Sequence, residues 1–169
     1  MNDLDRIERL SSLVQMDSDA VRTYEQALDE IEADAIRERL AQFRDEHIQH
    51  SEELSVVIQE LGGTPPSQET DMKGFLTEKF AAVRSLSGTE GALKTMQTNE
   101  KLTNRIYQEA RSWGLAPGAD ALIERYYRDE QRHLRSIREA LAERTWKQAQ
   151  WQPQIAEHRA RPARRPSVY

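Results

Sequence analysis

Apolar residues recur every three or four positions along four long segments of the chain, with polar residues between them. This spacing gathers the apolar side chains on one face of an α-helix. The predicted helices cover about residues 4–31, 35–61, 87–114 and 117–149. Because runs of Val, Ile and Thr typical of strands are scarce, the sequence predicts an all-α domain.

Start and stop signals flank these segments. Gly62, Gly63, Pro65 and Pro66 follow the second segment and predict a helix end there. The stretch Ser87-Gly88-Thr89-Glu90 can form a capping box before the third, because a serine stands three residues ahead of a glutamate. Before the second segment, Asp34 is expected to cap the helix.

The connections between the segments predict how the helices are arranged. Short turns join the first to the second helix and the third to the fourth, which makes each of these pairs antiparallel neighbours. About 25 residues separate the second helix from the third, and they carry a helical apolar face of their own: Met72, Phe75, Leu76, Phe80, Val83 and Leu86. A long connection of this kind between two short turns predicts a four-helix bundle with one helical crossover.

The end of the chain differs from the rest. Residues 1–151 are predicted to form the bundle, and residues 152–169 an Arg/Pro-rich C-terminal arm that is extended or disordered. Two interpretations of the arm stay open. It is either a frayed terminus or a segment that contacts a partner through its arginines.

An internal repeat relates the two helix pairs. A shift of 83 residues, the spacing of Leu10 and Leu93, places core positions of like kind on one another. The matching pairs are Leu10 and Leu93, Leu13 and Met96, Tyr24 and Tyr107, Leu40 and Ile123, Phe43 and Tyr126, and Leu54 and Ile137. In the same register, ionisable residues also match: Asp17 with Glu100, His47 with Glu130, and His50 with His133.

These six ionisable residues stand on the apolar faces of the helices. Measured from the nearer turn, each lies about 14 to 18 residues away, so at 1.5 Å per residue all six reach nearly the same height in the bundle. They are therefore expected to converge. A buried charge without compensation costs several kcal/mol, so the cluster needs a binding partner or an internal network.

A dinuclear metal site would satisfy such a cluster. Carboxylate-bridged sites in bundles take one carboxylate from each of two helices and a Glu-x-x-His motif from each of the other two. Here the single carboxylates are Asp17 and Glu100, and the motifs are Glu130-x-x-His133 and His47-x-x-His50, with histidine in place of glutamate. The alternative is a metal-free polar network, with His133 protonated beside Glu130 and Glu100 and with His50 beside Asp17.

Residues next to the cluster have expected roles as well. The hydroxyls of Tyr24, Tyr107 and Tyr126 are predicted to bond the ligand carboxylates, unless these tyrosines are only core rings. Glu25 and Glu46 stand beside the apolar faces and are held as reserve ligands.

Composition narrows the chemistry. The chain has 169 residues with no cysteine, which excludes disulfides, thiolate metal sites and cysteine nucleophiles and leaves His and carboxylate ligands. A net charge of -5 disfavours nucleic-acid binding. No apolar stretch is long enough to span a membrane, and the acidic start differs from a signal peptide, so a cytoplasmic location is expected.

With these motifs the chain resembles the ferritin-like superfamily, whose members include rubrerythrin, bacterioferritin and the miniferritins. The resemblance extends from Leu4 to about Ala142. The stretches from Phe43 to Pro65 and from Thr98 to Asn104 resemble an uncharacterised bacterial branch of that superfamily. The resemblance to the superfamily implies a dinuclear iron site that reacts with oxygen or peroxide. Asp17, His47 and His50 would hold one ion, Glu100 and His133 the other, and Glu130 would bridge them.

Two departures from the family pattern leave the identity and the number of the metal ions undecided. Asp17 is shorter than the usual glutamate, and His47 replaces a carboxylate, so zinc, manganese, a single ion or no metal are alternatives. The expected function is metal binding with ferroxidase or peroxide-consuming activity, in a homodimer. One alternative is a non-catalytic structural or stress-related bundle. Another is a metal-binding cargo protein that the arm attaches to a larger compartment.

Overall fold

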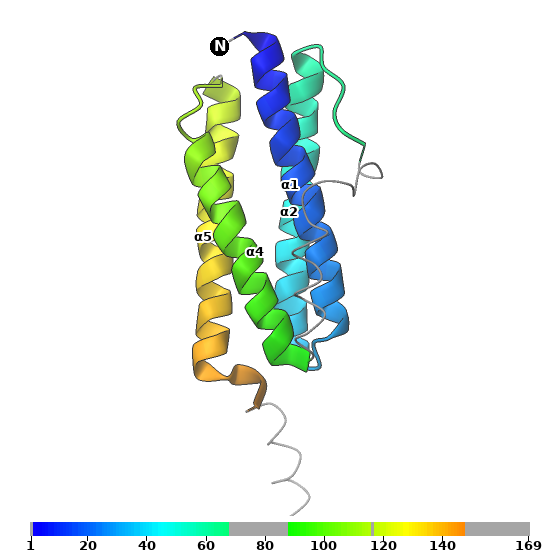
Figure 1. The fold of residues 1–169 in the computed structure, drawn as a ribbon, viewed down its shortest axis with the longest axis vertical. Coiled ribbons are helices and arrows are strands. Elements are labelled where there is room, and N and C mark those ends of the chain that lie inside the picture. Colours follow the sequence, from blue (N-terminus) through cyan, green and yellow to red (C-terminus); the bar gives the residue numbers. More distant parts are fainter. Residues whose placement is uncertain (1, 68–87, 116, 148–169) are drawn as a thin grey trace, which may run out of the picture.

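The computed structural model describes residues 2–67, 88–115 and 117–147, and four long α-helices make up most of these residues. The helices are α1 (Asp3–Asp29), α2 (Asp34–Glu60), α4 (Gly88–Ala110) and α5 (Pro117–Glu143) (Figure 1). No strand occurs in these ranges. The predicted all-α four-helix bundle is confirmed.

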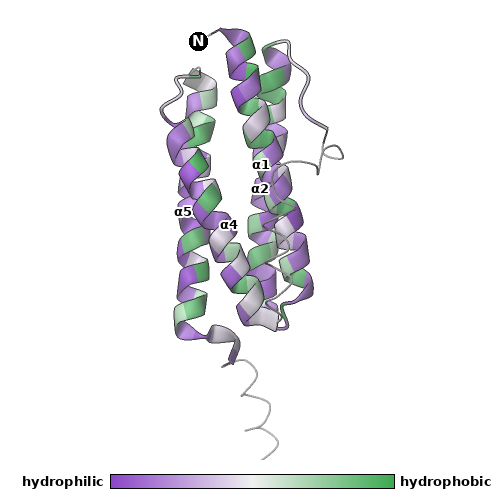
Figure 2. Ribbon diagram, in the orientation of Figure 1, coloured by the Kyte–Doolittle hydropathy of each residue, from purple (hydrophilic) through white to green (hydrophobic). Residues whose placement is uncertain are grey.

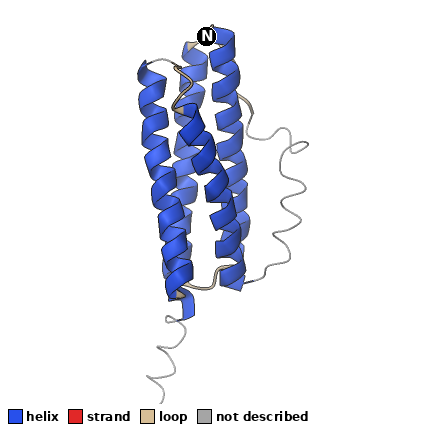
Figure 3. Cartoon of the chain, turned by 60° about the vertical axis from the view of Figure 1, so that its left-hand side comes forward, coloured by secondary structure: helices blue, strands red, loops and turns tan. Residues whose placement is uncertain are grey.

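The helices pack as two antiparallel pairs. α1 lies against α2 and α4 against α5, while α1 also contacts α4 and α2 contacts α5 (Figures 1 and 3). α2 ends and α4 begins at opposite ends of the bundle, so these two helices run in the same direction (Figure 1). The predicted crossover helix, the capping box at Ser87 and the arm at 152–169 lie outside the described residues.

The start of α1 and the α1–α2 turn show how local chemistry sets the helix ends. Asn2 caps α1 in a capping box with Asp5. The expectation that Asp34 caps α2 is wrong: the N-cap is Ala33, which makes no side-chain bond. Tertiary contacts hold the turn instead, because the backbone N–H of Glu32 donates to Thr89 Oγ1 at 3.2 Å.

Two glycines end α2 as expected. The N–H of Gly62 donates to the carbonyl of Gln59 and that of Gly63 to the carbonyl of Ile58, each at 2.9 Å. This is the Schellman arrangement, and it requires the positive φ of 79° that Gly62 adopts. Gly63 lies so close to Ile7 and Ile58 that a Cβ atom would approach their Cγ2 methyls to 2.9 Å.

Backbone conformation ends the last two helices. α4 stops at Ala110, earlier than predicted, because Ser112 and Trp113 bond to carbonyls only three residues back, and Gly114 follows with a φ of 62°. α5 ends at Glu143, because Arg144 takes a positive φ of 51°, although residues 145–147 are helical again. The predicted end near residue 149 lies outside the described residues. Neither helix end affects the middle of the bundle.

Two apolar clusters fill the core, one on each side of its middle. The first contains Leu10, Leu13, Leu54, Ile58, Tyr107, Leu115, Ile123 and Tyr126. The second contains Tyr24, Ile31, Leu40, Phe43, Leu93, Met96, Ile137 and Trp146. Polar and apolar residues alternate in short bands along every helix (Figure 2), and no helix among the described residues is long and apolar enough to cross a membrane.

A matched pair of glycine substitutions tests the packing at the end of α2. We expect Gly63→Ala to lower the free energy of unfolding by about 1–3 kcal/mol, because the methyls it meets are fixed on β-branched side chains. Gly118→Ala adds a methyl where no atom lies within 4 Å and leaves stability unchanged or slightly higher. Urea unfolding followed by circular dichroism measures both, and equal effects would contradict the packing described.

Candidate metal centre

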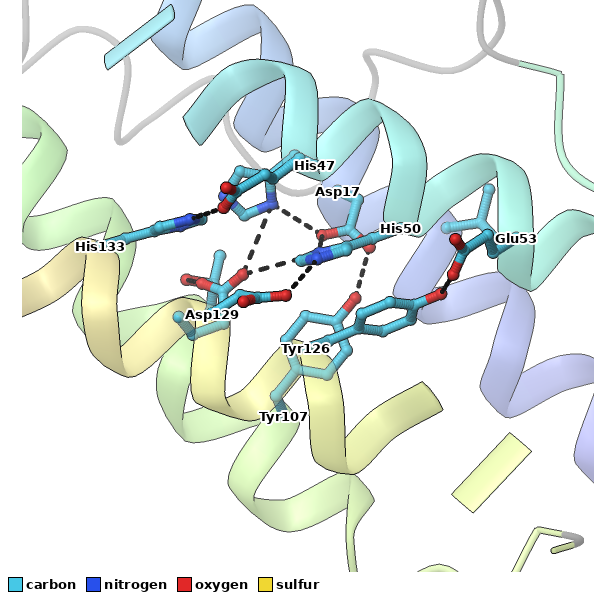
Figure 4. A network of polar contacts seen from close by, with 12 residues as sticks. Asp17, His47, His50, Glu53, Tyr107, Tyr126, Asp129 and His133 are labelled. Atoms are coloured by element: carbon cyan, nitrogen blue, oxygen red, sulfur yellow. Dashed lines mark hydrogen bonds and ion pairs between the residues drawn. The ribbon is translucent and has the colours of Figure 1, made fainter. Parts of the chain in front are cut away.

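Six ionisable side chains meet between the two apolar clusters. Asp17 comes from α1, His47 and His50 from α2, Glu100 from α4, and Glu130 and His133 from α5. Five of them are 0% exposed, and His50 is 2% exposed. The structure thus brings together all six residues that the sequence singled out, and Figure 4 labels Asp17 and the three histidines among them.

His47 lies at the middle of this cluster. Its Nδ1 is 2.9 Å from Asp17 Oδ1 and 3.6 Å from Glu130 Oε1, and its Nε2 is 3.5 Å from Glu100 Oε1. Within the described part of the chain, two groups of residues have ligand atoms within 4.8 Å of one another and could each hold a metal ion. They are Asp17, His47, His50 and Glu130, and His47, Glu100, Glu130 and His133.

The other two histidines turn one nitrogen inward and the other outward. His50 Nδ1 faces Asp17 Oδ1 at 4.0 Å, and His133 Nδ1 faces Glu100 Oε2 at 3.5 Å. Their outer Nε2 atoms meet carboxylates on the opposite helix pair. Asp129 Oδ2 lies 3.3 Å from His50 Nε2, and Glu46 Oε2 lies 2.5 Å from His133 Nε2. Such outer carboxylates fix the tautomer of a metal-binding histidine and leave its inner nitrogen free to bind.

The role of Asp129 was missed in the sequence, although the repeat contains the signal. The shift of 83 residues places Glu46 on Asp129. Glu46 itself, held as a reserve ligand, lies on the outer side of His133 and pairs with Arg132 there. The other reserve ligand, Glu25, does not join the cluster, because it is exposed and lines a surface pocket between α1 and α2.

The rings of His50 and His133 also pack against aromatic rings. Phe43 stacks on His133 with ring centroids 4.1 Å apart, and Tyr126 lies 3.9 Å from His50. The expectation that the Tyr126 hydroxyl bonds a ligand carboxylate is wrong, because it donates to Glu53 Oε2 at 2.6 Å (Figure 4). The repeat gives the reason: Tyr126 is the equivalent of Phe43, so its ring has the structural role and its hydroxyl reaches the rim.

The remaining two tyrosines donate hydrogen bonds to carboxylates of the other helix pair. Tyr24 donates to Glu100 Oε1 at 2.5 Å, and Tyr107 donates to Asp17 Oδ2 at 2.5 Å. Both tyrosines and both acceptors are fully buried. Each single carboxylate is therefore held by a hydroxyl from the other helix pair.

Neighbouring charges set the protonation of the metal-free cluster. Burial by itself would lower the pKa of His47, but the charge of Glu130 and other carboxylates outweighs it and raises the pKa well above its usual value. The pKa of His133 is also raised, because Glu100 and its neighbours outweigh burial, whereas burial lowers the pKa of His50. Burial raises the pKa of Glu130 to about 8. Without metal, protons therefore supply the positive charge.

These donors fit a metal centre. Thr103 donates to Glu130 Oε2, which leaves the other oxygen of that carboxylate for the centre of the cluster. Imidazole and carboxylate together suit iron, zinc and manganese. Five buried atoms of the cluster lack a hydrogen-bond partner: His47 Nε2, His50 Nδ1, Glu100 Oε2, Glu130 Oε1 and His133 Nδ1. Atoms bound to one ion at about 2.0–2.2 Å lie up to about 4.4 Å apart, so only a small contraction is needed.

Comparison with known proteins agrees with the fold. The chain belongs to the family described as a domain of unknown function (DUF2383), whose model matches residues 5–112 and so includes α1, α2 and α4. No curated protein matches the chain. Among solved structures, Rhodobacter capsulatus bacterioferritin, described with a metal-free dinuclear site and haem iron, matches with a TM-score of 0.61. It is 18% identical, and the match covers 84% of this chain and 87% of that one. The chain therefore has a ferritin-like fold, with buried groups that could hold a metal.

Two conservative substitutions test the hydroxyl contacts. We expect Tyr24→Phe and Tyr107→Phe each to lower the free energy of unfolding of the metal-free protein by about 1–3 kcal/mol, because each leaves a buried carboxylate oxygen without its donor. Tyr126→Phe serves as the control, since its acceptor Glu53 is partly exposed, and it costs less. Urea unfolding measures the free energy of unfolding of each variant. A negligible loss in Tyr24→Phe or Tyr107→Phe would refute the conclusion that both hydroxyls hold buried carboxylates.

Proposed function

We propose that the six buried residues hold a dinuclear iron centre and that the protein reduces oxygen or peroxide, as a ferroxidase or a peroxide-consuming oxidoreductase. One observation carries this proposal: five buried nitrogen and oxygen atoms lack a hydrogen-bond partner, and all of them belong to residues of the two possible ligand groups. An unsatisfied buried polar atom costs about 1–3 kcal/mol, so five of them together need a ligand. Two cations would satisfy them all.

Glu130 is the residue suited to bridge the two ions. It belongs to both possible ligand groups and has two oxygens, and Thr103 orients its carboxylate. Asp17 with His50 would complete one side, and Glu100 with His133 the other. When bound, ferrous ions would supply the electrons that reduce oxygen or peroxide.

The surrounding residues prepare the ligands for this task. Asp129 and Glu46 hold the outer nitrogens of His50 and His133, so that both Nδ1 lone pairs point inward. Tyr24 and Tyr107 fix the single carboxylates. The apolar clusters on both sides exclude bulk water, so the donors stay in place without competing hydrogen bonds.

The comparison with bacterioferritin supports the proposal by its shared fold. That protein is described with a dinuclear site. In this chain, three imidazoles and three carboxylates converge in the bundle core. Iron is our choice of metal, with zinc and manganese as alternatives. The cytoplasmic location, the homodimer and the division into 1–151 and 152–169 stay predictions.

Metal content tests the centre directly. After anaerobic dialysis against excess ferrous iron, elemental analysis is expected to find about two irons per chain in the wild type. Glu130→Gln keeps the size of the side chain but removes the charge that both ions share, and is expected to weaken binding at least about tenfold. Ser51→Ala, buried on the same helix as His47 but outside both ligand groups, is the control and keeps its iron. Equal metal in all three proteins would contradict the site.

Oxygen chemistry needs a separate measurement. The iron-loaded wild type should consume oxygen or hydrogen peroxide in step with oxidation of its iron, followed with an oxygen electrode and by absorbance. Glu130→Gln is expected to lose this activity together with its metal, and Ser51→Ala to keep it. A protein that binds iron at the site but consumes neither oxidant would support the rival proposal of a structural or stress-related bundle.

A further inference from the structure

The position of His47 makes the two halves of the centre unequal. Both possible ligand groups need this residue, because its Nδ1 faces Asp17 and its Nε2 faces Glu100. A neutral imidazole has only one nitrogen lone pair, and its other ring nitrogen carries a proton. His47 can therefore serve one ion as a neutral ligand but not both.

The hydrogen bonds indicate which nitrogen is free. Asp17 Oδ1 lies 2.9 Å from His47 Nδ1, within hydrogen-bond distance, and a carboxylate there accepts a bond from an N–H group. The distance from Nε2 to Glu100 Oε1 is 3.5 Å, and Nε2 is one of the buried atoms without a partner. When a cation replaces one of the two ring protons of His47, Nδ1 thus keeps its proton, and Nε2 offers its lone pair on the side of Glu100 and His133.

The repeat shows what is unusual about this arrangement. The equivalent of His47 in the second helix pair is Glu130. A carboxylate has two oxygens and can give one to each ion, whereas His47 gives its single lone pair to one side. The α2 motif is therefore the source of asymmetry in a centre whose other ligands match in kind.

We infer, on the basis of the proposed function, that the centre binds its two ions with unequal affinity. The tight ion is held by His47 Nε2, Glu100, Glu130 and His133. The weak ion has only Asp17, His50 and Glu130, and part of Asp17 is committed to orienting His47. This assignment reverses the one suggested by the sequence, in which His47 joins Asp17 and His50.

Titration of the metal-free protein with Co²⁺ under argon tests the inference by visible absorption and calorimetry. The wild type is expected to bind one equivalent tightly and a second at least about tenfold more weakly, the usual cost of an incomplete ligand environment. His47→Glu turns the α2 motif into a copy of Glu130-x-x-His133, and the two affinities should then become equal. Ser51→Ala is the control and keeps the unequal pair.

The outcomes separate this inference from the proposed function. Two equivalents of equal affinity in the wild type, or an unchanged difference in His47→Glu, would overturn the inference and leave the dinuclear centre in place. Failure of the wild type to bind Co²⁺ or ferrous iron in the core would overturn both.

A second measurement does not depend on any variant. In the protein loaded with Zn²⁺, nitrogen-15 NMR of the imidazoles should show His47 with a metal-bound Nε2 and a protonated Nδ1. The opposite tautomer, with metal on Nδ1, would overturn the assignment.

Discussion

Burial of six ionisable side chains at one level of an apolar bundle is the constraint on which the rest of this structure depends. Each uncompensated charge in such a place costs several kcal/mol, a large fraction of the stability of a domain. Carboxylates and imidazoles that meet at 2.9–3.6 Å offset part of that cost for one another. Five atoms of the cluster still lack a hydrogen bond, and a pair of cations would satisfy them.

The two helix pairs hold each other's ligands in place. His50 on α2 takes its ring partner Tyr126 and its carboxylate partner Asp129 from α5, and His133 on α5 takes Phe43 and Glu46 from α2. The single carboxylates are held in the same reciprocal way by buried tyrosine hydroxyls. Because these contacts cross between the pairs, the packing of the two pairs against each other also orients the donors. The donors are therefore in position before a metal arrives.

Much of this could be predicted from the sequence, because helical periodicity and the repeat of 83 residues place Asp17, the three histidines and both glutamates on the core faces at one height. Helix ends were harder to predict from the sequence, because the α1–α2 turn depends on a contact with Thr89 rather than on a cap at Asp34. The direction of a side chain was harder still. Tyr126 and Asp129 lie one turn or less from the ligands, and only their distances show that one contacts Glu53 and the other His50.

We propose that the cluster in the bundle core is a metal site and not a network held by protons alone. Anomalous diffraction at the iron edge, from crystals grown anaerobically with ferrous iron, tests it most directly. We expect anomalous peaks between Glu130 and the inward nitrogens of His50 and His133. A core without such a peak, with the six side chains hydrogen-bonded to one another, would contradict it.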